Sequence, residues 1–252
     1  MAYCKVSGKK IYYDQSITGS PNDSVILLIH GAGGTSEVWL NQLSQIKDYP
    51  LLALDLPGHG NSEGYPANTI AEYSQFIDEF VRTLELKSVI LAGHSMGGGV
   101  VLECVLANPE WLKGIILVDT GSRLHVKKEM LEQLAKRILP FDIIPYLYCQ
   151  NCSPEVLDKA KENMKSIIPQ VYFADFQACD AFDRSKEIQN INLEAYILCG
   201  EEDRMTPLKY SQALHEALPK SELKIIPQAG HMSMQENPVE VNKVIVEFLN
   251  RF

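Results

Sequence analysis

Ser95 lies in a Gly-x-Ser-x-Gly pentapeptide over residues 93–97, a spacing typical of a catalytic nucleophile. The apolar run 89–92 before it predicts a buried strand, and the residues from Met96 to Ala107 predict a helix. So sharp a turn from strand to helix holds the serine in a strained backbone conformation and lifts its hydroxyl clear of the sheet edge. The pentapeptide alone is common by chance, so its meaning depends on its neighbours.

A serine hydroxyl becomes a strong nucleophile only when a base removes its proton and a third group orients that base. In an open α/β sheet these groups meet in loops at the carboxyl ends of strands. His231 follows a predicted strand over 223–226, and Asp203 follows one over 195–199. We therefore expect Ser95, Asp203 and His231 to form a catalytic triad. Asp119, at another strand end, stays open as an alternative acid.

Attack by Ser95 on a carbonyl would place negative charge on oxygen, and N–H donors aimed at that oxygen would stabilise it. The backbone N–H of Met96, at a helix N-terminus, is one expected donor. The second is expected from the small-residue loop over 30–34, from Ala32 or, as the alternative, from Gly33. No catalytic role is expected for His30, His59 or His94.

The elements that must position these residues alternate along the chain. Short apolar strands are predicted over 24–29, 51–54, 89–93, 114–118, 195–199 and 223–226, after an opening hairpin over 3–5 and 10–16. Helices are predicted over 37–45, 70–84, 96–107, 207–218 and 238–252, with a capping box at Thr69 and Thr206 as an N-cap. This alternation predicts an α/β fold with an eight-stranded, mostly parallel sheet and helices on both faces.

Between residues 121 and 192 the alternation stops, and only helical segments divided by prolines are predicted. We expect a core of residues 1–120 and 193–252 and an inserted helical cap, or lid, of residues 121–192. An apolar substrate pocket is expected from Gly33, Trp39, Tyr146, Tyr172 and Phe176. The basic residues at 123, 125, 127, 128, 136 and 137 are expected to form a solvated face, with a site for a substrate carboxylate or an acidic carrier protein as the alternative.

Composition excludes some classes of partner and cofactor. The 252 residues are 46% hydrophobic, and the formal net charge of −9 argues against nucleic acid as a partner. No run is long enough for a membrane span and no secretory signal is recognised, so a cytoplasmic protein is expected. The six cysteines are expected to be reduced. Cys149 and Cys152 are spaced for a disulfide or for half a metal site, but no second ligand pair accompanies them, so two unpaired thiols and no metal are expected. No cofactor is expected.

Taken together, several motifs resemble the α/β-hydrolase superfamily. They are His30-Gly31, Asp55-x-Pro57-Gly58-x-Gly60-x-Ser62, the Ser95 pentapeptide, Asp203 and Gly230-His231. The order serine, aspartate, histidine is that of the family. Within it the chain is similar to small capped carboxylesterases, a group that overlaps in sequence with enol-lactonases, carbon–carbon hydrolases and cofactor-free haloperoxidases.

The resemblance implies hydrolysis of a small apolar ester or thioester through a Ser95 acyl-enzyme, without a cofactor. The alternatives are a carbon–carbon bond hydrolase or lactonase of the same fold, and a ligand sensor that keeps the triad. The sequence does not disclose the acyl length, the physiological substrate or the oligomeric state.

Overall fold

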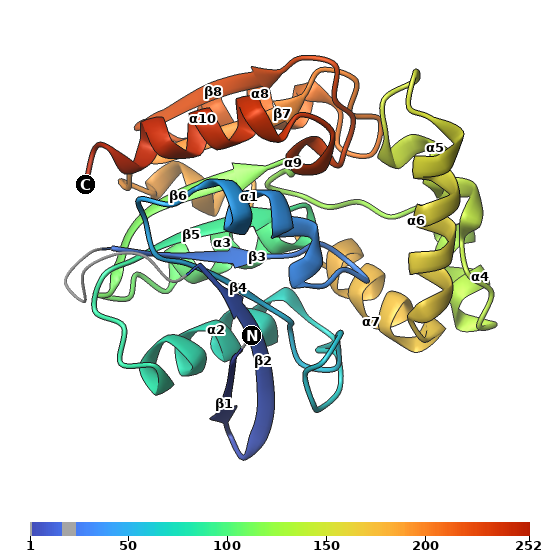
Figure 1. The fold of residues 1–252 in the computed structure, drawn as a ribbon, viewed down its shortest axis with the longest axis horizontal. Coiled ribbons are helices and arrows are strands. Elements are labelled where there is room, and N and C mark those ends of the chain that lie inside the picture. Colours follow the sequence, from blue (N-terminus) through green and yellow to red (C-terminus); the bar gives the residue numbers. More distant parts are fainter. Residues whose placement is uncertain (1, 17–23) are drawn as a thin grey trace.

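A computed structural model describes residues 2–16 and 24–252, and an eight-stranded sheet forms its centre (Figure 1). The strands are β1 (Ala2–Val6), β2 (Lys9–Gln15), β3 (Val25–Ile29), β4 (Leu51–Leu54), β5 (Val89–His94), β6 (Leu112–Val118), β7 (Ala195–Gly200) and β8 (Ser221–Ile226). Their order across the sheet is β1-β2-β4-β3-β5-β6-β7-β8. Pairing is antiparallel from β1 to β2 and from β2 to β4, and parallel between all other neighbours. The predicted mostly parallel sheet is confirmed.

Helices lie on both faces of this sheet and beside it. They are α1 (Leu40–Gln45), α2 (Ile70–Thr83), α3 (Met96–Leu106), α4 (Lys128–Ala135), α5 (Ile144–Leu147), α6 (Pro154–Ser166), α7 (Pro169–Asp180), α8 (Leu208–Ala217), α9 (Ser233–Glu236) and α10 (Pro238–Leu249). The apolar faces of α2, α3 and α8 pack in one hydrophobic cluster against the sheet, and those of α1 and α10 pack in a second cluster on its other face.

The helix ends show where local sequence decides and where it does not. The predicted capping box of α2 is confirmed, because the Thr69 hydroxyl accepts from the Glu72 N–H while the Glu72 carboxylate accepts from the Thr69 N–H. The helix expected over 37–45 begins as a 3-10 turn, Ser36–Trp39, before α1. The last helix ends at Leu249, earlier than expected, and the short α9 was not predicted.

The segment over 121–192 holds α4, α5, α6 and α7, which lie together beside the sheet (Figure 1). All of its residues are described, and within them the structure has no strand, only an isolated bridge between Arg123 and Asp183. The segment also has a small hydrophobic cluster of its own, which includes Leu134, Ile144 and Met164. These features support the proposed division into core and cap. Part of the proposed core, residues 1 and 17–23, lies outside the described residues.

Two expectations from composition can be compared with the described residues, 2–16 and 24–252. No helix in these ranges combines the length and the apolar character needed to cross a membrane. All six cysteines fall within them and are free thiols, including Cys149 and Cys152, so the expectation of unpaired thiols is confirmed.

Candidate active site

Ser95 occupies the predicted turn between a strand and a helix. β5 ends at His94 and α3 begins at Met96, and Ser95 between them has φ 52° and ψ −116°. A positive φ on such a residue costs ~1–3 kcal/mol, so the surroundings must hold the turn in place. They do so on both sides: the Ser95 N–H donates to the Val118 carbonyl at 3.0 Å, and the Thr120 hydroxyl donates to the Ser95 carbonyl at 2.7 Å.

Ser95, His231 and Asp203 lie in one hydrogen-bonded chain. His231 Nε2 is 2.9 Å from Ser95 Oγ, and His231 Nδ1 is 2.9 Å from Asp203 Oδ2. With its proton on Nδ1, the ring donates to the Asp203 carboxylate and leaves Nε2 free to accept the serine proton. Asp203 follows β7 and His231 follows β8, so both side chains reach the sheet edge at which β5 ends. The structure therefore brings together the three residues selected from the sequence.

Asp203 is buried but well supplied with hydrogen-bond donors. Its Oδ1 accepts from the N–H groups of Met205 and Thr206 at 2.8 and 2.9 Å, and its Oδ2 accepts from the Thr206 hydroxyl at 2.8 Å. Burial alone would raise the pKa of Asp203. The positive charge and hydrogen bond of His231, together with the Thr206 donors, outweigh burial and lower that pKa well below its usual value. The carboxylate is therefore ionised and able to stabilise a protonated His231.

The role of Thr206 corrects a prediction. We expected its side chain to cap the helix that follows, but α8 begins at Leu208 with Pro207 as its N-cap residue and no side-chain cap. The Thr206 hydroxyl instead donates to Asp203 and lies 3.3 Å from His231 Nδ1. The Asp203 carboxylate, three residues earlier, thus accepts from the hydroxyl that capping rules assign to the helix.

Asp119, the alternative acid, lies at the end of β6 but points to other partners. Its Oδ1 accepts from the Gly200 N–H at 2.7 Å, and its Oδ2 accepts from the Ser233 hydroxyl at 2.5 Å. Burial and the neighbouring charge of Asp203 raise the pKa of Asp119 to about 8. Since Asp203 holds the hydrogen bond to His231 Nδ1, the geometry favours Asp203 as the acid.

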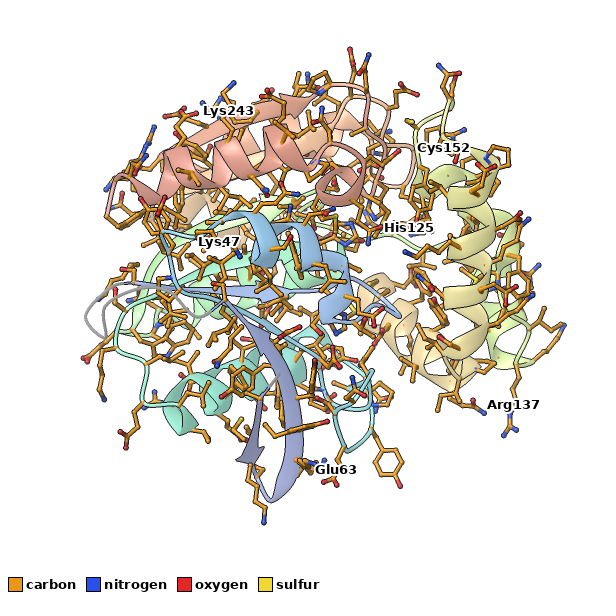
Figure 2. All side chains as sticks on the ribbon, in the orientation of Figure 1. Lys47, Glu63, His125, Arg137, Cys152 and Lys243 are labelled. Carbon is orange, nitrogen blue, oxygen red and sulfur yellow. The ribbon has the colours of Figure 1, made fainter. Side chains whose placement is uncertain are left out.

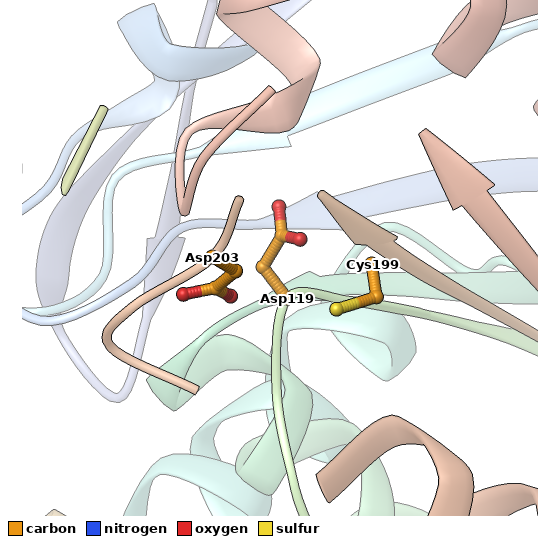
Figure 3. Close-up of side chains that lie close together, drawn as sticks. All are labelled: Asp119, Cys199 and Asp203. Carbon is orange, nitrogen blue, oxygen red and sulfur yellow. The ribbon is translucent and has the colours of Figure 1, made fainter. Parts of the chain in front are cut away.

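Asp119, Asp203 and Cys199 form a cluster whose potential ligand atoms lie within 4.8 Å of one another (Figure 3). This donor set is a poor fit for a metal ion. Both carboxylates already accept hydrogen bonds from protein groups, and burial raises the pKa of the Cys199 thiol to about 12, whereas a metal binds the thiolate.

The two candidate oxyanion donors come from different elements. Met96 is the first residue of α3, where the N–H groups have no partner within the helix. Ala32, in the loop after β3, lines the cavity beside Ser95. Gly33 is a poorer candidate, because its N–H donates to the Asp175 carboxylate of α7 at 2.7 Å. The Gly33 alternative is thus disfavoured by this contact.

The histidines expected to have no catalytic role hold the loops of the site. The His30 ring donates from Nδ1 to the Gly31 carbonyl and accepts from the Leu56 N–H at Nε2, at 2.8 and 3.1 Å. The His94 ring donates from Nε2 to the backbone carbonyl of His231 at 2.8 Å. Burial lowers the pKa of both His30 and His94 to about 3, so each ring is neutral.

A cavity of about 60 Å³ opens beside Ser95. Compared with the volume that one buried water molecule requires, the cavity is large enough for a few water molecules or a short acyl chain. Its walls come from the loop after β3, the turn at Ser95, the chain before α4, helix α7 and the loops after β7 and β8. The lining residues are Ala32, Ser95, Arg123, Leu124, His125, Val126, Phe176, Cys179, Met205, Thr206, Tyr210 and His231.

The residues predicted to form an apolar pocket have different positions. Phe176 lines the cavity, and Tyr172 stacks against it with ring centroids 6.2 Å apart. Trp39 does not line the cavity: its side chain is fully buried in the hydrophobic cluster against α1 and α10. Tyr146 is half exposed, and its ring lies under the Arg204 guanidinium. An aromatic residue type thus does not distinguish a pocket wall from a core position.

Three of the six basic residues after β6 meet local carboxylates. His125 Nδ1 lies 3.3 Å from Asp180, Arg123 lies 3.7 Å from Asp183, and Lys128 pairs with Glu132 one helical turn away. Arg137 points away from the core and is exposed, whereas His125 lies where the chain passes between core and cap (Figure 2). These pairs and the exposure of Arg137 favour a solvated face, although Arg123 and His125 also line the cavity beside Ser95.

Comparison with known proteins agrees with the geometry. The family described as the alpha/beta hydrolase family matches residues 26–244. The hydrolase YugF of Bacillus subtilis (strain 168) is 28% identical, over 97% of this chain and 96% of its own. A thermophilic esterase of known structure is 31% identical, with a TM-score of 0.86 over 99% of this chain and 97% of its own. The enol-lactonase of Burkholderia xenovorans LB400 shares the fold, with a TM-score of 0.90 at 22% identity over 99% and 100%.

Proposed function

The chain belongs to the alpha/beta hydrolase family, and from this we propose that it is a serine hydrolase that cleaves a carboxylic ester or thioester of a small acyl group. The observation that carries the proposal is the hydrogen-bonded chain from Ser95 through His231 to Asp203, with 2.9 Å at each step. The 31% identity to a thermophilic esterase supports the same reaction class.

In the proposed reaction, His231 Nε2 takes the Ser95 proton as Oγ attacks the acyl carbon. The N–H groups of Met96 and Ala32 stabilise the resulting oxyanion, each contributing ~2.7–4 kcal/mol. The intermediate collapses by breaking the bond to the leaving alkoxide or thiolate, which receives the proton from His231. Water then attacks the acyl-enzyme with His231 again as base, releasing the carboxylic acid and restoring Ser95.

The cavity limits the acyl group. A volume of about 60 Å³, with Phe176 and Val126 among the lining residues, favours a short acyl chain. We therefore expect short acyl esters to be preferred.

The test is kcat/KM for p-nitrophenyl esters of increasing acyl length, with a Ser95→Ala variant prepared in parallel. We expect sustained turnover that is fastest for the short esters and that falls to background in the variant, a loss of roughly 10⁶-fold in kcat. Activity that survives Ser95→Ala would contradict the proposal.

The same measurement separates the alternatives. A single burst of p-nitrophenol without turnover would point to a triad-retaining sensor. For the carbon–carbon hydrolase or lactonase, a dienol carboxylate substrate and a simple lactone serve as comparisons: a kcat/KM for either that exceeds the best ester by tenfold or more would replace the ester in this assignment.

A further inference from the structure

Asp175 is a fully buried carboxylate on α7 that contacts three separate parts of the core. Its Oδ2 accepts from the Gly33 N–H at 2.7 Å and from His59 Nε2 at 2.8 Å, and its Oδ1 accepts from the Tyr73 hydroxyl at 2.5 Å. These donors belong to the loops after β3 and β4 and to α2. A buried carboxylate with three donors is well satisfied, so the arrangement fixes α7 against all three elements.

His59 has the contacts of a protonated imidazole in this arrangement. Its Nε2 faces the Asp175 carboxylate and its Nδ1 faces the Pro57 carbonyl at 3.1 Å, so both ring nitrogens meet acceptors. Burial lowers the pKa of His59, but the charge and hydrogen bond of Asp175 outweigh burial and leave that pKa above its ordinary value. Asp175 is therefore one half of a buried ion pair, and its removal would leave His59 uncompensated.

The same face of α7 holds Gly33 in a second way. Tyr172 lies three residues before Asp175, so the two side chains project from one side of the helix. Gly33 has φ +62°, and a Cβ on it would lie 2.0 Å from the Tyr172 ring. The ring thus packs directly on the Gly33 backbone while Asp175 binds its N–H. Since the peptide unit that carries the Gly33 N–H joins it to Ala32, these two contacts fix the backbone beside a candidate oxyanion donor.

We propose that Asp175 is a positioning residue for the reaction: through the Gly33 N–H it holds the loop after β3 in the conformation that presents the Ala32 N–H to the oxyanion. This inference rests on the proposed hydrolase function. Formation of the oxyanion hole then depends on how α7 packs against the core. The same helix supplies Phe176 to the acyl cavity and orders the loop that stabilises the transition state.

The test compares three variants with the wild-type protein, using the best short ester and the trifluoromethyl ketone of the same acyl group, whose adduct with Ser95 carries an oxyanion. Asp175→Asn keeps the shape but loses the charge. Tyr73→Phe removes one donor and leaves the Gly33 contact intact. Glu103→Gln is the matched control, because the Arg184–Glu103 ion pair, at 2.7 Å, joins the chain after α7 to α3 without touching the loop.

For Asp175→Asn we expect kcat to fall by about 100-fold, the effect of displacing an oxyanion donor, with KM changed by less than about threefold. The reason is that one amide oxygen replaces two acceptors, and the NH2 group must face one of the three donors that now hold the Gly33 loop to α7. The Ki of the ketone should rise by the same factor as kcat/KM falls. Tyr73→Phe should lose less than about fivefold, in line with one hydrogen bond, and Glu103→Gln less than about twofold, in line with a partly exposed ion pair. NMR titration should report a lower pKa for His59 in Asp175→Asn than in the wild-type protein.

Equal losses in Asp175→Asn and Glu103→Gln, or a ketone Ki that stays at the wild-type value, would overturn the inference and leave Asp175 as a structural anchor. If Asp175→Asn does not fold, His59→Gln replaces it in the test, because this variant keeps the Gly33 contact. Its ketone Ki must stay within about threefold of the wild-type value, as expected for one lost hydrogen bond. A larger rise in a folded His59→Gln variant would also overturn the inference. If the wild-type protein turns over no ester, the proposed function itself is rejected. That outcome differs from an active wild-type protein with an equally active Asp175→Asn variant, which would overturn only this inference.

Discussion

Two buried carboxylates at neighbouring strand ends have opposite protonation behaviour. Asp203 accepts from His231 and from the loop before α8, and these contacts hold its pKa well below the ordinary value in spite of burial. Asp119, beside it, meets fewer donors, and burial with the charge of Asp203 raises its pKa to about 8. One carboxyl is thus kept ionised next to the base while the other keeps its proton at neutral pH, which limits like-charge repulsion behind His231.

Replacement of these two acids should separate their roles. Burial alone would lower the pKa of His231, but Asp203 raises it above 6.5, and His231 must be neutral to act as base. The kcat/KM of the wild-type protein should therefore rise with pH through a midpoint above 6.5. Asp203→Asn should shift that midpoint to lower pH and reduce the plateau of kcat/KM by roughly 10³–10⁴-fold. Asp119→Asn should reduce kcat/KM by less than about tenfold, because it weakens hydrogen bonds that do not touch His231. A larger loss in Asp119→Asn would make Asp119 the acid.

The residues of this site differ in how far sequence predicts them. Ser95, Asp203 and His231 could be selected because each follows an apolar strand, and the ends of parallel strands converge. Thr206 was assigned to helix capping, but its hydroxyl donates to Asp203, three residues earlier, which is oriented by the distant His231. Asp175 was not selected at all, since its contact with Gly33 spans 142 positions. Its only signal is a carboxylate on the apolar face of α7.

At the scale of elements, the contact between α3 and the sheet depends on glycines that differ in what surrounds them. A Cβ on Gly97 would lie 2.5 Å from the Ile29 carbonyl oxygen, a backbone atom that cannot move aside. A Cβ on Gly99, two residues further along α3, would lie 3.1 Å from a methyl group of Leu124, which can rotate. The first glycine therefore sets how closely β3 and α3 approach, and the second does not.

Alanine at these two positions provides a matched comparison. Gly97→Ala should lower the free energy of unfolding by about 3 kcal/mol or more, because the backbone of β3 must shift, and should reduce activity by displacing Ser95. The free energy of unfolding of Gly99→Ala should stay within about 1 kcal/mol of the wild-type value, because the higher helix propensity of alanine roughly offsets the cost of displacing the Leu124 side chain. Urea unfolding followed by circular dichroism measures both. Similar losses in the two variants would mean that the approach of α3 is not limited by Gly97.

Element positions were predicted better than element ends. The strands were identified because runs such as β5 are buried along their whole length, which only an apolar sequence permits. Trp39 was misplaced because the chain before α1 turns in a 3-10 helix and directs the indole into the core, on the face opposite to α2 and α3. That turn is held by Asp55, in the loop after β4, which accepts from the Ser36 N–H across 19 positions.

For the whole molecule, the buried titratable groups determine how stability changes with pH. Burial lowers the pKa of His30 and His94 to about 3, so these residues destabilise the fold only below pH 6.5, where the unfolded chain takes up their protons. His59 and His231 behave oppositely, since their carboxylate partners raise the pKa of each above 6.5 in spite of burial. Their contribution is complete below pH 6.5 and is lost as pH rises through the folded-state pKa.

Asp119 adds to this loss in the same range. Its pKa is about 8 in the fold against 3.8 for the free side chain, so the folded protein holds a proton that the unfolded chain has released. The free energy of unfolding must then fall as pH rises, by about 2 kcal/mol between pH 6.5 and 8 from this group alone. We expect Asp119→Asn to remove that part of the slope, because an amide cannot ionise and can still accept from the Gly200 N–H. Urea unfolding at constant ionic strength measures it. Parallel curves for the two proteins between pH 6.5 and 8 would mean that Asp119 is ionised at neutral pH, and that Asp203 and Asp119 are charged together behind His231.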